Sequence, residues 1–166
     1  MDGHVIGYMK KINWKTLLIS LVISLGTGAL SAALTADSMT KYRQMYKPPL
    51  APPGWVFPVV WTILFILMGI AAWLVYESGS PDAGQALRLY AVQLAVNAVW
   101  PILFFRLDLY LLSFAWLVLL WYLVYLLTGR FRKIVPAAGA LLVPYLVWLT
   151  FAGYLNLAIA IHYWKG

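Results

Sequence analysis

The sequence predicts an all-α integral membrane protein, a bundle of five transmembrane helices. Of its 166 residues, 64% are hydrophobic and only 10% are charged, which is too few polar side chains to cover a soluble globule of this size. Five nearly uncharged runs are each about long enough to cross a hydrocarbon core, which needs roughly 17 to 25 helical residues. Lipid cannot satisfy exposed backbone amides, and these runs are longer than the strands of a membrane barrel, so the spans should be helical.

The five spans should form a single membrane domain covering residues 1–166. Short polar links make consecutive helices antiparallel neighbours, and the longest link is expected to be a loop over residues 37–53. The net charge of +7 indicates juxtamembrane contact with anionic lipid, and no basic stretch has the length for nucleic-acid binding. The expected helices lie at about 16–36, 54–76, 86–105, 109–128 and 134–162.

The first span has to be distinguished from a secretory signal peptide, because a basic flank precedes it. Its apolar run of about 21 residues is longer than the roughly 7 to 15 residues of a signal-peptide core. Small residues recur at every fourth position, at Ser20, Ser24, Gly28 and Ala32, and this spacing lets helices pack closely in a membrane. The run is therefore interpreted as a retained transmembrane helix.

The second span follows a proline-rich stretch, residues 47–54. Its four prolines remove amide donors and limit backbone freedom, which predicts a stiff, preshaped rim. Within the span, Trp61, Phe65 and Met68 share one helical face. Pro58, just before this face, is predicted to bend the helix.

The third span carries two amides and two aromatic rings on one face. Gln93, Asn97, Trp100 and Phe104 stand at i, i+4, i+7 and i+11, so this face should point into the bundle. Pro101 removes the donor for the Asn97 carbonyl, which predicts a bend beside the face. The amides are either hydrogen-bonding contacts between helices or polar groups in a pocket wall, and both interpretations can hold together.

The last span repeats this design. Pro144 precedes Tyr145, Trp148 and Ala152, which stand at i, i+3 and i+7, and Asn156 follows one turn later. Tryptophans this far from the span ends are less typical of a membrane-interface belt than Trp55 is. A cavity lined by indoles and a few amides suits a large, flat, mostly apolar ligand.

Charged residues are absent from the middle of every predicted span. Pumps and ion-coupled carriers usually need such groups as relays, so these classes and conventional ion channels are disfavoured. Catalysis by paired carboxylates or by a Ser-His-Asp triad lacks its residues for the same reason. The chain has no cysteine, and His4 and His162 lie near its two ends, so no metal site is expected.

The C-terminal residues Leu157, Tyr163 and Lys165 fit a loose pattern proposed for cholesterol contact. A membrane-interface anchor formed by the same tyrosine and lysine with Trp164 explains them equally well. Both interpretations stay open at this point.

Three motifs in order make the chain similar to the TspO/MBR family, the tryptophan-rich sensory proteins related to the mitochondrial translocator protein, also called the peripheral benzodiazepine receptor. They are KPPLAPPGWVFPVVWT at residues 47–62, Q-x3-N-x2-W followed by FF at 93–105, and VPYLVWLTFAGYLN at 143–156. The resemblance extends from the first span to the end of the chain. It implies a five-helix bundle, commonly dimeric, in a bacterial cell membrane.

The resemblance also implies a cavity that opens toward the loop 37–53, which acts as its lid. Family ligands include porphyrins such as protoporphyrin IX, sterols in some members, and synthetic isoquinoline carboxamides and benzodiazepines. No cofactor is implied as obligatory; a porphyrin would be ligand or substrate. Many relatives carry an aromatic residue or a Ser-Trp pair where this chain has Leu50 and Ala51, so one stacking surface of the lid is expected to be missing. The predicted ligand-binding residues, from the helical faces and the resemblance together, are Tyr42, Trp61, Phe65, Gln93, Asn97, Trp100, Tyr145, Trp148, Ala152 and Leu155.

Several functions are consistent with these residues. The first is a membrane receptor or binding protein for porphyrins or sterols, with a role in regulating or trafficking tetrapyrroles; Lys41, Arg43 and Lys47 would meet either ligand carboxylates or lipid headgroups. The second is an enzyme that degrades porphyrin in light and oxygen, with Trp61 and Trp148 as its catalytic residues. A transporter and a structural scaffold are the remaining alternatives, although no internal repeat supports an alternating-access cycle.

Overall fold

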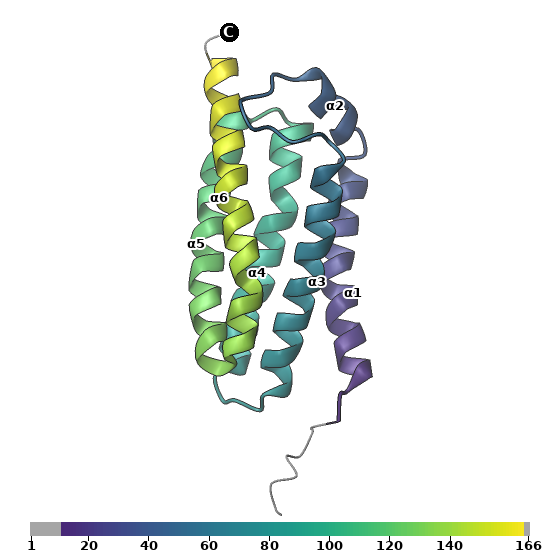
Figure 1. The fold of residues 1–166 in the computed structure, drawn as a ribbon, viewed down its shortest axis with the longest axis vertical. Coiled ribbons are helices and arrows are strands. Elements are labelled where there is room, and N and C mark those ends of the chain that lie inside the picture. The colour runs from purple at the N-terminus through teal and green to yellow at the C-terminus, as the bar shows by residue number, and fades with distance from the viewer. Residues whose placement is uncertain (1–10, 165–166) are drawn as a thin grey trace, which may run out of the picture.

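The computed structural model describes residues 11–164, and their regular secondary structure is entirely helical (Figure 1). Five of these helices are long and apolar enough to cross a membrane by length and composition, which confirms the all-α membrane class predicted from the sequence. The elements are α1 (Trp14–Leu34), α2 (Ser38–Gln44), α3 (Val56–Glu77), α4 (Ala83–Pro101), the π-helix η1 (Ile102–Arg106), α5 (Tyr110–Ile134) and α6 (Pro136–Trp164).

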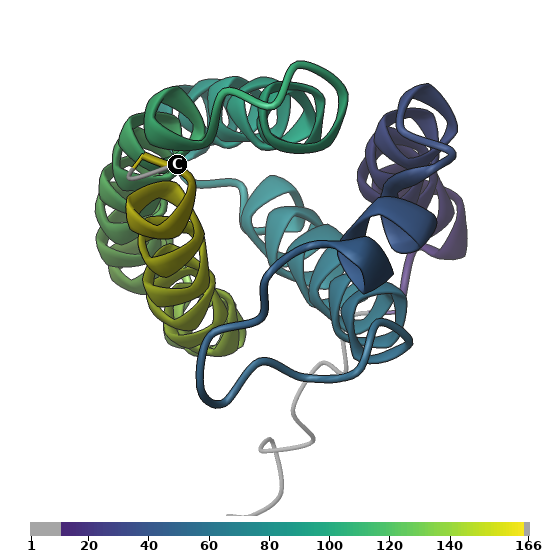
Figure 2. The ribbon, with the colours of Figure 1, turned by 90° about the horizontal axis from the view of Figure 1, so that it is seen from above.

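The long helices lie side by side, and the segment from α2 to the start of α3 crosses one end of the bundle (Figure 2). α6 packs on α5 and α3, and α1 packs on α3 and α4. Among consecutive spans, α4 with α5 and α5 with α6 form extensive contacts, whereas α3 and α4 touch more sparsely. Both of these last two helices contribute walls to the site described below.

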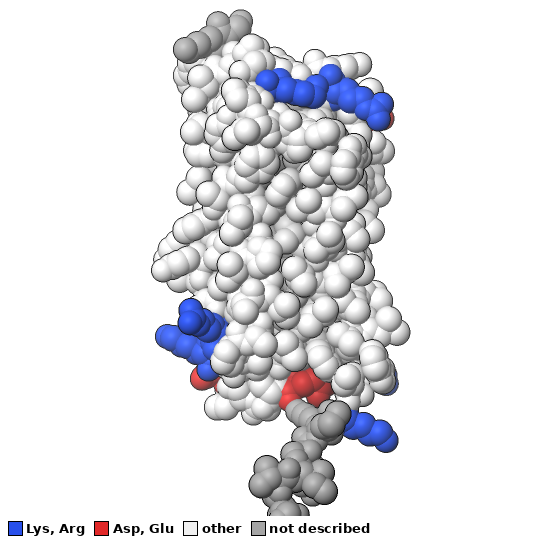
Figure 3. Space-filling model, viewed as in Figure 1, with Lys and Arg blue, Asp and Glu red and all other residues white. Residues whose placement is uncertain are grey.

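On the face drawn in Figure 3, charged side chains gather at the two ends of the molecule, and a broad band between them has none. Large apolar side chains are exposed instead, including Leu18 and Val22 of α1 and Tyr122 of α5, which are 63%, 62% and 54% exposed. Such a surface is stable in hydrocarbon and not in water. The protein is therefore a multi-pass integral membrane protein.

The small residues of α1 bring it close to α3. The Ser20 hydroxyl donates a hydrogen bond to the Gly69 carbonyl over 2.7 Å. A methyl group on Gly28 would lie 2.6 Å from the Phe65 ring, and one on Gly69 would lie 2.7 Å from Ser24 Oγ. The every-fourth-residue spacing thus produces the close helix contact that it predicted.

The three span prolines have different effects. α4 changes from α to π winding directly after Pro101, and η1 closes with a hydrogen bond from Leu107 N to the Ile102 carbonyl; a π turn absorbs a missing donor within a helix. α6 runs through Pro144 as one helix. Pro58, where a bend was predicted, lies in the first turn of α3; its amide would have no helical partner there anyway, so no helical bond is lost that would bend the helix.

Two predicted links are more helical than expected. The loop predicted over 37–53 contains α2. The reversal predicted at residues 129–133 lies farther on, because α5 continues to Ile134 and the chain turns at Val135. Arginine and lysine are good helix formers, and Val135 is extended because it precedes Pro136.

Candidate ligand-binding site

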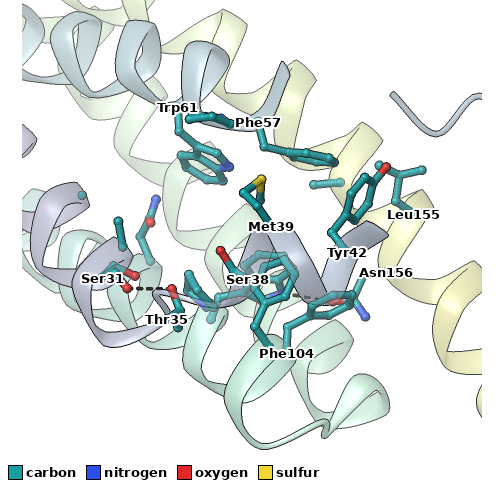
Figure 4. Close-up of a pocket in the computed structure, with 18 of the residues that line it drawn as sticks. Ser31, Thr35, Ser38, Met39, Tyr42, Phe57, Trp61, Phe104, Leu155 and Asn156 are labelled. Atoms are coloured by element: carbon teal, nitrogen blue, oxygen red, sulfur yellow. Dashed lines mark hydrogen bonds between the residues drawn. The ribbon is translucent and has the colours of Figure 1, made fainter. Parts of the chain in front are cut away.

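A cavity with a volume of about 330 Å³ lies beneath α2. Its walls come from α1, α3, the α4–η1 junction and α6, and α2 forms its roof. Figure 4 shows Phe57 and Trp61 on one side and Ser31 and Thr35 on another, with Met39 between them. This volume is at the lower end of the range for small-molecule sites, roughly 300 to 1,000 Å³.

The structure brings seven of the ten predicted ligand-binding residues to this cavity, namely Tyr42, Trp61, Phe65, Asn97, Trp100, Ala152 and Leu155. Trp148 lines a smaller adjoining cavity of about 20 Å³, together with Trp61 and Asn97. Gln93 and Tyr145 line neither cavity. They are 0% and 1% exposed and lie behind the wall, where they hold Asn97.

The roof is held by Tyr42, which is 3% exposed. Its ring packs edge-on against Phe57, with 4.9 Å between centroids, and its hydroxyl donates to the Pro52 carbonyl over 2.6 Å. Burial raises the pKa of this hydroxyl above its usual value, so it stays protonated and remains a donor at neutral pH. Tyr42 thus ties α2 to the proline-rich rim and to α3.

A second fastening joins α2 to the end of η1. Lys41 Nζ donates to the Phe105 carbonyl and pairs with the Asp108 carboxylate. Asp108 has a φ of +55°, a conformation that aspartate adopts more readily than most residues. Lys47 Nζ donates to the Arg43 carbonyl, whereas the Arg43 side chain is exposed.

The indoles of Trp61 and Trp148 each pack against another aromatic ring. Trp61 lies 6.2 Å from the Tyr145 ring in an edge-to-face arrangement, and Trp148 lies 5.8 Å from Phe57 in the same geometry. The Trp148 Nε1 atom is buried and has no hydrogen-bond partner among the described residues. Buried indole N–H groups usually have a partner, so this donor is an exception to the usual pattern.

Trp100 is held in place by a buried polar cluster. Its Nε1 donates to Asn156 Oδ1 over 3.0 Å. The Ser113 hydroxyl, whose one proton has the Tyr110 carbonyl at 2.8 Å as its nearer acceptor, lies 3.2 Å from the same oxygen. Asn156 Nδ2 donates to the Tyr110 carbonyl over 2.9 Å. Asn156 therefore positions the Trp100 indole, because its Oδ1 accepts the indole N–H and its Nδ2 is anchored on Tyr110.

Sequence reasoning missed the wall that α1 contributes and, apart from Tyr42, the side chains of α2. Gly28 and Ser31 of α1, Thr35 just after α1, and Ser38 and Met39 of α2 all line the cavity. The small-residue spacing in α1 was the available signal, but it was interpreted only as a packing surface. The side chains of α2 lie in a segment that was predicted to be a loop.

The sterol-motif residues lie away from the cavity. Leu157 and Tyr163 are 37% and 42% exposed on α6, and Lys165 lies outside the described residues. The Tyr163 hydroxyl accepts a hydrogen bond from Tyr46 N over 3.0 Å, and its ring stacks on Tyr110 at 5.2 Å. Tyr163 therefore fastens the segment after α2 to the end of α6.

The chain is similar to known proteins over most of its length. The model of the TspO/MBR family matches residues 18–162. The chain is 37% identical to the tryptophan-rich protein TspO of Chlorobaculum tepidum over 147 residues, which is 87% of this chain and 93% of that relative. It is 37% identical to the tryptophan-rich sensory protein of Cereibacter sphaeroides (87% and 89% covered) and 38% identical to the translocator protein of Bos taurus (82% and 83% covered). With five membrane spans, a cavity beneath α2 and a match over most of its length, this chain belongs to the TspO/MBR family.

Proposed function

We propose that this protein is a membrane receptor or binding protein for flat, mostly apolar ligands, chiefly porphyrins such as protoporphyrin IX, with sterols as a second class. Its role would be in regulating or trafficking tetrapyrroles. The observation that carries the proposal is the aromatic cavity closed by α2. Aromatic rings stack on a flat ligand, and the few polar groups orient it.

The size of the cavity bears on how a porphyrin would enter. A macrocycle is large for about 330 Å³, so α2 would have to lift or the ligand edge would have to protrude through the mouth. Either way the carboxylates of the ligand would reach the exposed Arg43 of the lid. Lys41 is already paired with Asp108, which leaves Arg43 the better partner.

Titration of the purified protein with protoporphyrin IX in the dark, followed by tryptophan fluorescence, tests the proposal. We expect saturable quenching, and weaker binding in Trp61→Phe because the indole wall shrinks. Trp121→Phe is the matched control, since Trp121 lies on α5 outside both cavities and bonds Thr150. Quenching that never saturates would remove the proposal.

A second candidate is oxidative degradation of the bound porphyrin in light. The observation that favours it is that Trp61 and Trp148 line the same small cavity. Molecular oxygen would be the oxidant: an excited macrocycle can take an electron from a stacked indole and pass it to oxygen, and the superoxide formed beside the ring would then oxidise the macrocycle. Illuminating the complex and following porphyrin absorbance tests this: Trp148→Phe should slow the loss, and equal rates in wild type, Trp61→Phe and Trp148→Phe would exclude it.

A further inference from the structure

A chain of buried polar groups runs behind the cavity wall. Gln93 Nε2 donates to Met68 Sδ over 3.8 Å, the Tyr145 hydroxyl donates to Gln93 Oε1 over 2.9 Å, and Asn97 Nδ2 donates to the Tyr145 oxygen. Met68, Gln93, Tyr145 and Asn97 are 0%, 0%, 1% and 5% exposed. This series of hydrogen bonds links α3, α4 and α6, and it ends at the cavity, which Asn97 lines.

The chemistry of Met68 sets the direction of this chain. A thioether sulfur has no proton and can only accept, so Gln93 must turn its NH₂ group toward Met68. Gln93 then offers Oε1 to Tyr145, whose single hydroxyl proton is used on it. The Tyr145 oxygen is left to accept, so Asn97 must present its NH₂ group there.

Asn97 is consequently held with Nδ2 toward Tyr145, where one of its two N–H groups is used, and with Oδ1 as its unused acceptor. No described residue donates a hydrogen bond to Asn97 Oδ1. This oxygen is also not one of the fully buried polar atoms that lack a partner. The neighbouring wall, at the end of α1, likewise has hydrogen-bond acceptors that are still unused. Ser31 Oγ donates to the Ala98 carbonyl and Thr35 Oγ1 donates to the Ser31 carbonyl, so both hydroxyl protons are used and both oxygens can still accept.

We propose that Met68, Gln93 and Tyr145 are positioning residues that fix Asn97 Oδ1 toward the cavity, so that this wall selects ligands carrying an O–H or N–H donor. The inference rests on the proposed function, because it concerns which ligands the cavity prefers. It adds a polarity to the cavity that stacking on indoles does not supply, since aromatic faces do not distinguish a donor from an acceptor at the ligand edge.

Two flat fluorescent probes test this polarity in the full-length protein in detergent micelles. 1-Hydroxypyrene has an O–H donor, and 1-methoxypyrene has only an acceptor on the same ring system. Binding is followed by energy transfer from tryptophan, and each dissociation constant is corrected for partition of the probe into empty micelles. We expect the wild type to bind 1-hydroxypyrene roughly tenfold more tightly than 1-methoxypyrene. This factor corresponds to the free-energy difference between making one buried hydrogen bond and leaving its acceptor unsatisfied.

Gln93→Leu should reverse the preference rather than abolish binding. Without Gln93, the Tyr145 proton has no other acceptor and turns to Asn97, which must then offer Oδ1 to Tyr145 and its NH₂ group to the cavity. The ratio of the two dissociation constants should fall by at least about tenfold. Tyr145→Phe should bring the ratio close to one, since nothing then orients Asn97.

Gln85→Leu is the matched control, because it makes the same change at an exposed position of α4 and should leave the ratio unchanged. Met68→Leu, which conserves side-chain volume, decides the outcome if Gln93→Leu fails to fold; it should lower the ratio by several-fold. An unchanged ratio in the folded variants, even with both probes weakened equally, would overturn the inference and leave the proposed function intact. Absence of saturable binding of both probes would overturn the proposed function and this inference with it.

Discussion

The two ends of the bundle are built differently. At the end away from α2, which we call the packed end, the core is continuous and apolar: Val75, Val124, Leu127, Phe131 and Leu142 are all 0% exposed. At the end beneath α2, which we call the cavity end, buried amides and hydroxyls lie among the rings and the main cavity opens.

The difference shows what keeps a space open inside a membrane protein. Apolar side chains pack until voids disappear, as they do at the packed end, where a methyl group on Gly139 would lie 2.5 Å from Arg132 Cβ. At the cavity end the walls are held by directional bonds, such as those from Trp100 to Asn156 and from Asn156 to the Tyr110 carbonyl. Hydrogen bonds fix the walls at defined positions without filling the space between them.

The largest expected effect is on the packed end. Phe131→Ala removes a ring that is 0% exposed and packs beside Tyr90, and it should destabilise the protein by about 3–5 kcal/mol. Probe affinity of the fraction that stays folded should be nearly unchanged. Thermal unfolding in detergent and pyrene titration below the transition measure the two quantities; a large loss of affinity in folded protein would contradict the separation of the two ends.

A substitution at the cavity end should show the opposite pattern. Ala152 lines both cavities and is 7% exposed, so Ala152→Phe would place a ring in the ligand space. We expect affinity for flat ligands to fall about a hundredfold, or roughly 2.7 kcal/mol, with a small change in unfolding temperature. Val147→Phe, on the exposed side of α6, is the control and should alter neither quantity much.

The contact between α1 and α3 separates packing from helix propensity. Gly28→Ala would force a methyl group to 2.6 Å from the Phe65 ring and should destabilise by about 1–3 kcal/mol. Gly26→Ala has nothing within 4 Å and should stabilise by about 0.5–1 kcal/mol, because alanine favours the helix. Chemical denaturation of both variants tests the pair; equal effects would mean that α1 does not pack as closely as described.

The sequence predicted the spans and their inward faces better than it predicted the details of the cavity end. The spans were predictable because a membrane crossing fixes the length of an apolar run, and helical spacing found the inward faces of α3, α4 and α6. Spacing gives the face of a helix but not depth, so it could not show that Gln93 and Tyr145 lie behind the wall while Asn97 lines the cavity. α2 was missed because seven residues rarely form a helix alone, and contacts such as that of Lys41 with Phe105 hold it.

The smallest expected effect concerns the lid. Lys41 and Asp108 side chains are 33% and 54% exposed, so their pairing should contribute only about 0–1 kcal/mol to stability. Its effect should appear in the kinetics instead, because opening α2 breaks it and ligand exit requires that opening. Asp108→Asn, which keeps a residue tolerant of positive φ, should raise the ligand dissociation rate several-fold while the unfolding temperature stays within error.

Stopped-flow release of 1-hydroxypyrene into excess empty micelles measures that rate, and Asp82→Asn is the control at the opposite end of the bundle, where Asp82 is exposed. High salt should speed release from the wild type and leave release from Asp108→Asn nearly unaffected, since a partly exposed ion pair is screened. Equal dissociation rates in the wild type and Asp108→Asn would mean that the ligand leaves between helices, through the sparse contact of α3 with α4, and that α2 is a fixed roof and not a lid.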